Sequence, residues 1–260
     1  MDMNLDTTTL VFFSPTHTTE KVVKAIGSGI GFPRREYVDL TLEVEEPERI
    51  LTDRLTVIGV PVYAGRVAPL AVERLKRIKG NGCPAVLVAV YGNRDYEDAL
   101  VELYDLAVEA GFRPFAAAAF VGEHSYSRKG MPIAEGRPDE ADLKQAKEFG
   151  HKCLEKLQQP DCFESFFIKG NRPYRSVAPS APQAPVCNEN CFGCGECLTV
   201  CPTAAMSRDA EGKIVTDAGK CIKCCACVKA CPNEARIFDT PYTAMLHTKF
   251  STPRQPEMFL

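Results

Sequence analysis

The chain has 260 residues, of which 45% are hydrophobic and 25% are charged, and its formal net charge is −3. These values are ordinary for a globular protein, and the length is sufficient for two domains with hydrophobic cores. So small a net charge gives no reason to expect a nucleic-acid or membrane partner. Residues 1–9 lack the features of a signal peptide, and no apolar run is long enough to cross a bilayer. We therefore expect a cytoplasmic protein.

Strand-like and helix-like segments alternate over the first part of the chain. A β-branched and aromatic run at residues 8–13 predicts a buried strand. The other predicted strands are residues 35–40, 55–60, 84–91 and 114–121, and the predicted helices are residues 20–26, 70–78, 97–110 and 138–157. This alternation predicts an α/β fold with a five-stranded parallel sheet. Ligands of such sheets bind beyond the carboxyl ends of the strands, where this chain has loops 14–19, 61–67 and 91–96.

The loop after the first predicted strand is rich in hydroxyl groups. It reads Ser14-Pro15-Thr16-His17-Thr18-Thr19 and precedes a predicted helix. A helix N-terminus presents unpaired N–H groups and a dipole that favours anions, so hydroxyls at this place are typical of a phosphate site. A plain helix cap is the alternative, but a single serine or threonine would suffice for it. We therefore favour phosphate binding.

The pattern Ser14-x-Thr16-x-x-Thr19 resembles the FMN phosphate loop of flavodoxins. The resemblance implies a flavodoxin-like fold with FMN at the point where the strand order reverses. That family usually has glycine at the position of His17. The histidine therefore predicts either a changed turn or an imidazole beside the phosphate.

The two other loops carry residues suited to the flavin ring. Tyr63 and Tyr91 are candidates to flank the isoalloxazine, with packing at the rim of the sheet as the alternative for each. Asn93 is a candidate to bond the pyrimidine edge, and Arg66 is a candidate for phosphate, reduced flavin or solvent. The predicted flavin-binding residues are Ser14, Thr16, His17, Thr18, Thr19, Pro61, Val62, Tyr63, Ala64, Gly65, Tyr91, Gly92, Asn93 and Tyr96.

Three later segments have no predicted role in the sheet. Residues 122–137 are too long for a simple connection, and we expect them to cover the flavin or a domain interface. Residues 160–185 contain five prolines and predict an extended, semi-rigid linker. The tail, residues 241–260, is predicted to wrap around another domain or a second subunit, so the sequence is compatible with a homodimer.

Eight of the 13 cysteines form two runs with identical spacing. The runs are Cys191-x2-Cys194-x2-Cys197-x3-Cys201-Pro202 and Cys221-x2-Cys224-x2-Cys227-x3-Cys231-Pro232. With this spacing, the fourth cysteine of each run ligates the cluster of the other run. We therefore assign Cys191, Cys194, Cys197 and Cys231 to one 4Fe-4S cluster, and Cys201, Cys221, Cys224 and Cys227 to a second. Structural zinc is the alternative, but it would leave cysteines surplus in both runs.

Residues 187–240 resemble bacterial-type two-cluster ferredoxins, including the Cys-Pro-x-x-Ala sequence that closes each run. Acids and bases nearly balance in this stretch, whereas a freely diffusing carrier is expected to be strongly acidic. We therefore expect the clusters to exchange electrons with something attached to them. Of the other cysteines, Cys83, Cys153 and Cys162 are predicted to be buried, and Cys187 and Cys225 lie beside the predicted ligands.

The whole chain thus resembles a flavodoxin-like domain, residues 1–159, fused through its linker to a ferredoxin domain, residues 186–240. The resemblance implies an anaerobic electron-transfer protein that relays electrons between two 4Fe-4S clusters, FMN and a redox protein partner. No acid/base pair, nucleophile or substrate motif is evident in the sequence. The first alternative is an FMN-dependent reductase of a small substrate. The second is a flavin-free iron–sulfur sensor or docking module.

Overall fold

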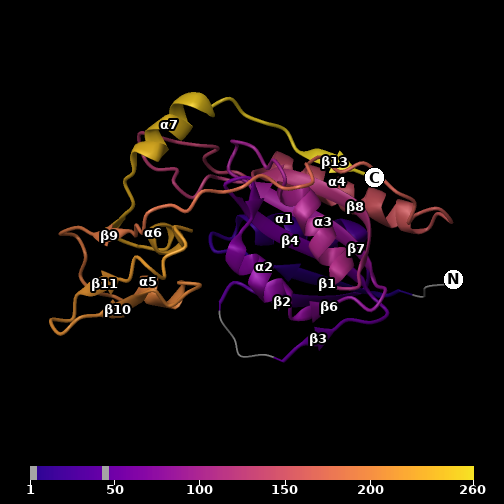
Figure 1. Ribbon diagram of the computed structural model, residues 1–260, viewed down its shortest axis with the longest axis horizontal. Helices are drawn as coiled ribbons and strands as arrows, with labels where there is room; N and C mark the ends of the chain where they lie inside the picture. The colour runs from indigo at the N-terminus through magenta and orange to yellow at the C-terminus, as the bar shows by residue number, and fades with distance from the viewer. Residues whose placement is uncertain (1–4, 43–46) are drawn as a thin grey trace.

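The computed structural model describes residues 5–42 and 47–260, and a parallel sheet forms its centre (Figure 1). The parallel strands are β2 (Arg34–Asp39), β1 (Thr7–Phe12), β4 (Leu55–Tyr63), β7 (Pro84–Tyr91) and β8 (Arg113–Val121), in that order across the sheet. Numbered among themselves, these strands have the order 2-1-3-4-5, which is that of flavodoxin-like folds. The predicted five-stranded parallel sheet is confirmed. We call this part of the chain the sheet domain.

Helices cover both faces of the sheet. Helices α1 (Thr18–Ile30) and α4 (Glu140–Leu157) pack on one face, and α2 (Pro69–Leu75) and α3 (Ala99–Glu109) pack on the other. Because both faces are covered, the central strands β4 and β7 are almost continuously apolar and buried.

Two helices end at residues other than those predicted. Helix α1 continues four residues past the predicted end at Ile26, through Gly27 and Gly29, because packing against α4 outweighs the low helix propensity of glycine. Helix α2 ends before Ile78, since Ile78–Lys79 instead forms the short strand β6, which pairs with β3 (Arg49–Ile50).

The tail adds an antiparallel strand to the parallel sheet. After helix α7 (Pro241–Lys249), the chain runs back along the sheet domain, and β13 (Glu257–Phe259) pairs with β8 (Figure 1). Strand β8 is buried over eight of its nine residues, so it requires a covered edge. Of the two predicted positions for the tail, the structure shows wrapping around the other domain of the same chain.

The cysteine-rich domain, which contains both cysteine runs, is built from short elements. Its strands are β9 (Val186–Cys187), β10 (Met206–Arg208), β11 (Ile214–Thr216) and β12 (Arg236–Ile237), and its helices are α5 (Glu196–Thr199) and α6 (Ala226–Lys229). The strands form two antiparallel pairs, β9 with β12 and β10 with β11. Its hydrophobic cluster is small and is formed by the buried residues Cys197, Met206, Ile214 and Cys227.

The cysteine-rich domain packs against the sheet domain near the carboxyl ends of the parallel strands (Figure 1). The Arg74 guanidinium of α2 donates hydrogen bonds to the carbonyls of Leu40, 2.8 Å away, and Pro202, 2.6 Å away. Lys229 of α6 donates to the carbonyl of Ser127 at 2.9 Å. Within the described residues, no helix has the length and apolar character needed to span a bilayer.

Candidate functional site

The hydroxyl-rich loop wraps the N-terminus of α1. The Ser14 hydroxyl accepts a hydrogen bond from the N–H of Glu20 at 3.0 Å, and the Ser14 N–H donates to Thr41 Oγ1 at 2.8 Å. In the part of the chain that the structure describes, no protein acceptor is bonded to the N–H groups of Thr18 and Thr19 or to the buried Thr19 hydroxyl. Unpaired donors at the start of a 13-residue helix fit an anionic group such as a phosphate.

His17 takes the conformation that glycine would take. Its φ angle is +62°, in the left-handed region, and it immediately precedes the first residue of α1. The side chain points away from the loop, where Nδ1 lies 2.8 Å from Glu20 Oε2 and 70% of the side chain is exposed. The left-handed turn accepts histidine, and the imidazole faces solvent. The left-handed conformation costs a non-glycine residue about 1 kcal/mol.

The loop after β4 is a tight hairpin that presents Tyr63. Ala64 and Gly65 have φ angles of +52° and +81°, and Tyr63 pairs with Arg66 of strand β5 (Arg66–Val67). Two positive φ angles define a two-residue turn whose twist matches its strands. Gly65 is required because a Cβ there would lie 1.9 Å from Glu97 Oε2.

Tyr63 stands between the flavin loops and the second cysteine run. Burial raises the pKa of its phenol well above the ordinary value, and the adjacent Cys224, Cys225 and Tyr126 raise it further. The phenol is therefore protonated at neutral pH.

The loop after β7 is more enclosed than the sequence predicted. Tyr91 and Tyr96 are 3% and 0% exposed, and their ring centroids lie 5.4 Å apart. The Tyr96 hydroxyl donates to Glu257 of the tail at 2.8 Å. Asn93 is held by the tail as well, since its amide donates to the carbonyls of Phe250 and Thr252 and its carbonyl accepts from the Arg254 N–H. Among Tyr63, Tyr91, Asn93 and Tyr96, only Tyr63 is therefore a partly exposed residue.

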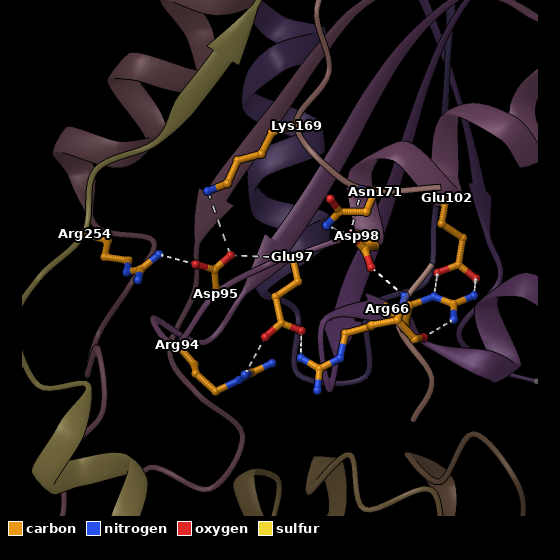
Figure 2. A network of polar contacts seen from close by, with 10 residues as sticks. Arg66, Arg94, Asp95, Glu97, Asp98, Glu102, Lys169, Asn171 and Arg254 are labelled. Atoms are coloured by element: carbon orange, nitrogen blue, oxygen red, sulfur yellow. Dashed lines mark hydrogen bonds and ion pairs between the residues drawn. The ribbon is translucent and has the colours of Figure 1, made fainter. Parts of the chain in front are cut away.

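Arg66 is engaged within the protein. Its guanidinium forms two hydrogen bonds with Glu102, at 2.8 and 2.7 Å, and lies 4.6 Å from the Tyr174 ring centroid (Figure 2). The linker joins this network, because Asp98 accepts hydrogen bonds from the backbone N–H groups of Asn171 and Arg175 at 2.8 and 2.7 Å. The linker is thus anchored along α3, and Arg66 positions it instead of contacting a phosphate.

Residues 122–137 contribute aromatic side chains that the sequence did not single out for specific contacts. The His124 ring packs directly against Gly92 in the loop after β7, so closely that a Cβ on Gly92 would lie 2.4 Å from the ring. Its Nδ1 accepts the Tyr126 N–H at 3.0 Å, so the neutral imidazole carries its proton on Nε2. Burial, Arg94 and Lys229 lower the pKa of His124 to about 4.

The same segment contacts the cysteine-rich domain. The Tyr126 ring lies 5.1 Å from that of Phe238, centroid to centroid, and Arg128 pairs with Asp239 at 2.7 Å. Of its two predicted positions, residues 122–137 therefore lie at a domain interface.

Four of the predicted cluster ligands line one pocket, and they come from both runs. Cys201 of the first run meets Cys221, Cys224 and Cys227 of the second. Burial raises the pKa of Cys224 to about 12, and the proximity of Cys227, Cys201 and Cys221 contributes to the rise. Four converging thiols that repel each other as anions are stabilised by binding iron, so this set fits a 4Fe-4S cluster.

The other predicted set is less enclosed. Cys194 is exposed, Cys191 and Cys231 are partly exposed, and Cys197 is buried beside Cys187 and Cys194. The closing cysteines of the two runs have the same local geometry: Cys231 Sγ accepts the Ala235 N–H at 3.2 Å, and Cys201 Sγ accepts the Ala205 N–H at 3.3 Å. Among the described residues, no three His, Cys, Asp or Glu side chains are grouped closely enough to hold a single metal ion.

Arg236 is a buried cation that the sequence analysis did not identify as part of the site. Its guanidinium lies 3.3 Å from Cys187 Sγ and 3.9 Å from Cys227 Sγ, and it donates to Thr216 Oγ1 at 2.7 Å. A buried positive charge here offsets the negative charge of thiolate ligands. Cys187 and Cys225 make their own contacts, as each thiol donates to a carbonyl, that of Ile214 and that of Lys223 respectively.

Comparisons with known proteins agree with the cysteine spacing. Residues 186–232 match the family model of a 4Fe-4S dicluster domain. The thiosulfate reductase electron transfer subunit PhsB of Salmonella typhi is 48% identical over 43 residues, which make up 16% of this chain and 22% of that protein. The uncharacterized ferredoxin-like protein YdhX of Escherichia coli (strain K12) is 38% identical over 53 residues, which make up 20% of this chain and 24% of that protein. The match thus spans about a quarter of each relative.

Solved structures similar to the sheet domain include flavodoxins. One from the domain Archaea is 14% identical, with 59% of this chain and 99% of the flavodoxin covered at a TM-score of 0.39. The FMN-bound flavodoxin of Fusobacterium nucleatum is 17% identical, with 59% of this chain and 99% of the flavodoxin covered at a TM-score of 0.37. The flavodoxin-like class of the sheet domain follows from its own strand order. The cysteine-rich domain is a ferredoxin-like 4Fe-4S domain.

Proposed function

We propose that the protein is an electron-transfer iron–sulfur flavoprotein that holds two 4Fe-4S clusters and FMN and exchanges electrons with a redox protein partner. The observation that carries this proposal is the position of Tyr63, which belongs to a flavin loop and lies beside Cys224 and Cys225 of the cluster pocket. An iron–sulfur cluster transfers one electron at a time, whereas bound flavin takes up one or two.

The cysteine spacing and the unpaired donors at the start of α1 support an assignment of residues to each group. Cys201, Cys221, Cys224 and Cys227 would ligate one cluster, and Cys191, Cys194, Cys197 and Cys231 the other. Thr18 and Thr19 would bind the FMN phosphate with backbone N–H groups at the start of α1. Tyr63 would contact the ring, and the Nε2–H of His124 is a candidate hydrogen-bond donor on the same side of the sheet.

The contacts between the domains bury residues beside the second cysteine run. Ile222, which follows the ligand Cys221, packs against the apolar core of the sheet domain, and Cys225 is 2% exposed. Since these contacts lie within one chain, electron exchange between the groups needs no second subunit. The residues at positions 122–137, where a reductase would have covered its substrate, contact the cysteine-rich domain instead.

Anaerobic purification followed by quantitation of FMN, iron and sulfide per chain tests the proposal. We expect one FMN and about eight irons, the content of two cubane clusters. The Thr19→Val variant, which removes the unbonded hydroxyl, should bind FMN more weakly at unchanged iron content. A protein with full iron content that binds no added FMN would contradict the flavin part of the proposal and leave the flavin-free sensor.

A further inference from the structure

The two cysteine runs are copies of one motif, but they differ in what covers them. In the second run, Cys224, Cys225, Ala226 and Cys227 are all buried. At the equivalent positions of the first run, Cys194 and Glu196 are exposed, and only Cys197 is buried. After the closing cysteines the contrast is reversed, since Pro202 of the first run is buried and Pro232 of the second is exposed. This reversal follows the predicted ligand sets, in which each closing cysteine belongs with the three cysteines of the other run. The sheet domain accounts for this difference, because Arg74 binds the Pro202 carbonyl at 2.6 Å.

The residue after the first cysteine shows how this motif docks. Ile222, after Cys221, packs against the apolar core of the sheet domain. Its equivalent, Phe192 after Cys191, is larger and 67% exposed. The second run therefore uses the apolar side chain of Ile222 to place its cysteines against the sheet domain. The other copy presents a larger apolar side chain to solvent, beside the exposed ligand Cys194.

The charge around Phe192 is negative. Glu189, Glu196 and Glu234 are exposed, and none of them forms an ion pair with any residue that the structure describes. One base lies nearby, Arg208, and its guanidinium donates to the carbonyls of Gly193 and Gly212 at 2.6 and 3.2 Å.

Several other bases of the domain are directed elsewhere. Lys223 donates to Ser180 and Ala181 of the linker, Lys229 pairs with Glu123, and Arg236 is buried. Lys213 pairs with Glu211 at 3.0 Å, and Lys220 is exposed. The acidic character is therefore local to Phe192 and is not a property of the whole domain.

We propose that this outer surface, formed by Glu189, Phe192, Cys194, Glu196 and Glu234, is the docking surface for a separate redox protein. The partner presents an apolar contact ringed by lysine and arginine. This inference rests on the proposed electron-transfer function and adds to it the surface and the chemistry of the partner. Opposite charges steer the encounter, and Phe192 fixes the contact beside the first cysteine run, as Ile222 does at the second.

The test uses the reduced holoprotein and cytochrome c, a cationic one-electron acceptor. The reduced protein loses one electron for each ferric haem that becomes ferrous, and stopped-flow absorbance gives the rate. We expect the rate for the unmodified protein to fall steeply with ionic strength. The triple variant Glu189→Lys, Glu196→Lys and Glu234→Lys should react at least about tenfold more slowly at low salt.

A matched control carries the same change of charge on the helices of the sheet domain. In Glu73→Lys, Glu109→Lys and Glu155→Lys, three exposed glutamates of α2, α3 and α4 are reversed. This control should retain most of the rate, whereas equal rates in the two triple variants would overturn the proposal. Phe192→Ala should slow the reaction several-fold, and Phe192→Leu should restore most of it, if the contact is apolar.

Two further measurements separate docking from the state of the cofactors. Ferricyanide, a small oxidant that needs no docking surface, should oxidise all variants at similar rates, and failure in every variant would count against the proposed function itself. Carbodiimide links carboxylates to lysine amines in contact, so mass spectrometry of the complex reports on docking without electron transfer. Links at Glu189, Glu196 or Glu234 are expected, and links confined to the sheet domain would overturn the proposal.

Discussion

The two domains reach their folds by different means. The sheet domain buries apolar side chains on both faces of a parallel sheet, among them Phe115, Phe120 and Phe149, each fully buried. The hydrophobic cluster of the cysteine-rich domain has four buried members, and two of these, Cys197 and Cys227, are predicted cluster ligands. A chain segment of this size buries too little apolar surface for independent stability. The sheet domain is therefore stabilised by its own apolar core, whereas we expect the cysteine-rich domain to depend on iron–sulfur ligation for its fold.

The largest expected effect is therefore the removal of iron. Chelation under anaerobic conditions should unfold the cysteine-rich domain, because the bonds to iron replace the missing core. Hydrogen exchange followed by mass spectrometry should show loss of protection in β10 and β11 and retention in β4 and β7. Equal protection of both domains before and after chelation would contradict this.

A substitution in the core of the sheet domain should destabilise that domain and leave the iron content unchanged. Phe115 of β8 is 0% exposed and packs edge-on against Phe163 at 6.2 Å between centroids. Phe115→Ala should lower the free energy of unfolding of the sheet domain by about 3–5 kcal/mol, through lost burial and a cavity. Urea unfolding measures the loss, and the iron content of the purified protein should not change. Val215→Ala, at a side chain that is 42% exposed, is the control and should cost far less.

A smaller effect is expected where the two domains meet. Arg74→Ala would leave the buried carbonyls of Leu40 and Pro202 without their guanidinium donor, at a cost of about 1–3 kcal/mol. Hydrogen exchange should rise at residues 40–41 and 202–204 and stay constant in the sheet. Arg77→Ala, in the turn that follows α2, serves as a control and should leave exchange at residues 202–204 unchanged. An unchanged pattern in Arg74→Ala would show that this contact does not join the domains.

The smallest expected effect is a loosening of the linker at low pH, where Asp98 becomes protonated and its hydrogen bonds with the linker weaken. Burial raises the pKa of Asp98, but hydrogen bonds from the N–H groups of Arg175 and Asn171 outweigh it, so that the pKa lies below its ordinary value. A lowered pKa means that the linker contact is complete above about pH 4, the ordinary Asp value, and weakens as the pH falls further. Limited pepsin digestion between pH 4 and pH 2 should cut the linker progressively faster. Asp98→Asn should already be cut faster at pH 4, and no difference there would contradict the assignment.

Local patterns in the sequence predicted most of the fold and the meeting of four cysteines from the two runs. Strand β7 was predicted with its observed bounds, since its eight residues are uniformly apolar and the chain has clear turn residues beyond it. The cysteine spacing predicted that Cys201 meets Cys221, Cys224 and Cys227 across the two runs, because the ligand geometry of a cluster is encoded in short steps.

Contacts between distant segments could not be predicted in this way. Tyr91 and Asn93 have the residue types and the position of flavin ligands, but the tail lies over this loop. Strand β13 is three residues long and pairs with a strand more than a hundred residues away, so no local pattern predicts it. The conformation of His17 could not be predicted for another reason. A left-handed turn tolerates histidine, so the residue type does not indicate the φ angle that the structure shows.

The pairing of β13 with β8 makes the cysteine-rich domain an insertion. The linker stays in contact with the sheet domain as far as Arg175, and the tail contacts it again from Phe250 onward, so the inserted domain is tethered at both ends. A double tether restricts how far the inserted domain can swing, and it raises its effective concentration at the carboxyl ends of the strands above that of a single flexible linker. The cluster pocket is thereby confined near Tyr63 even when individual interface contacts open.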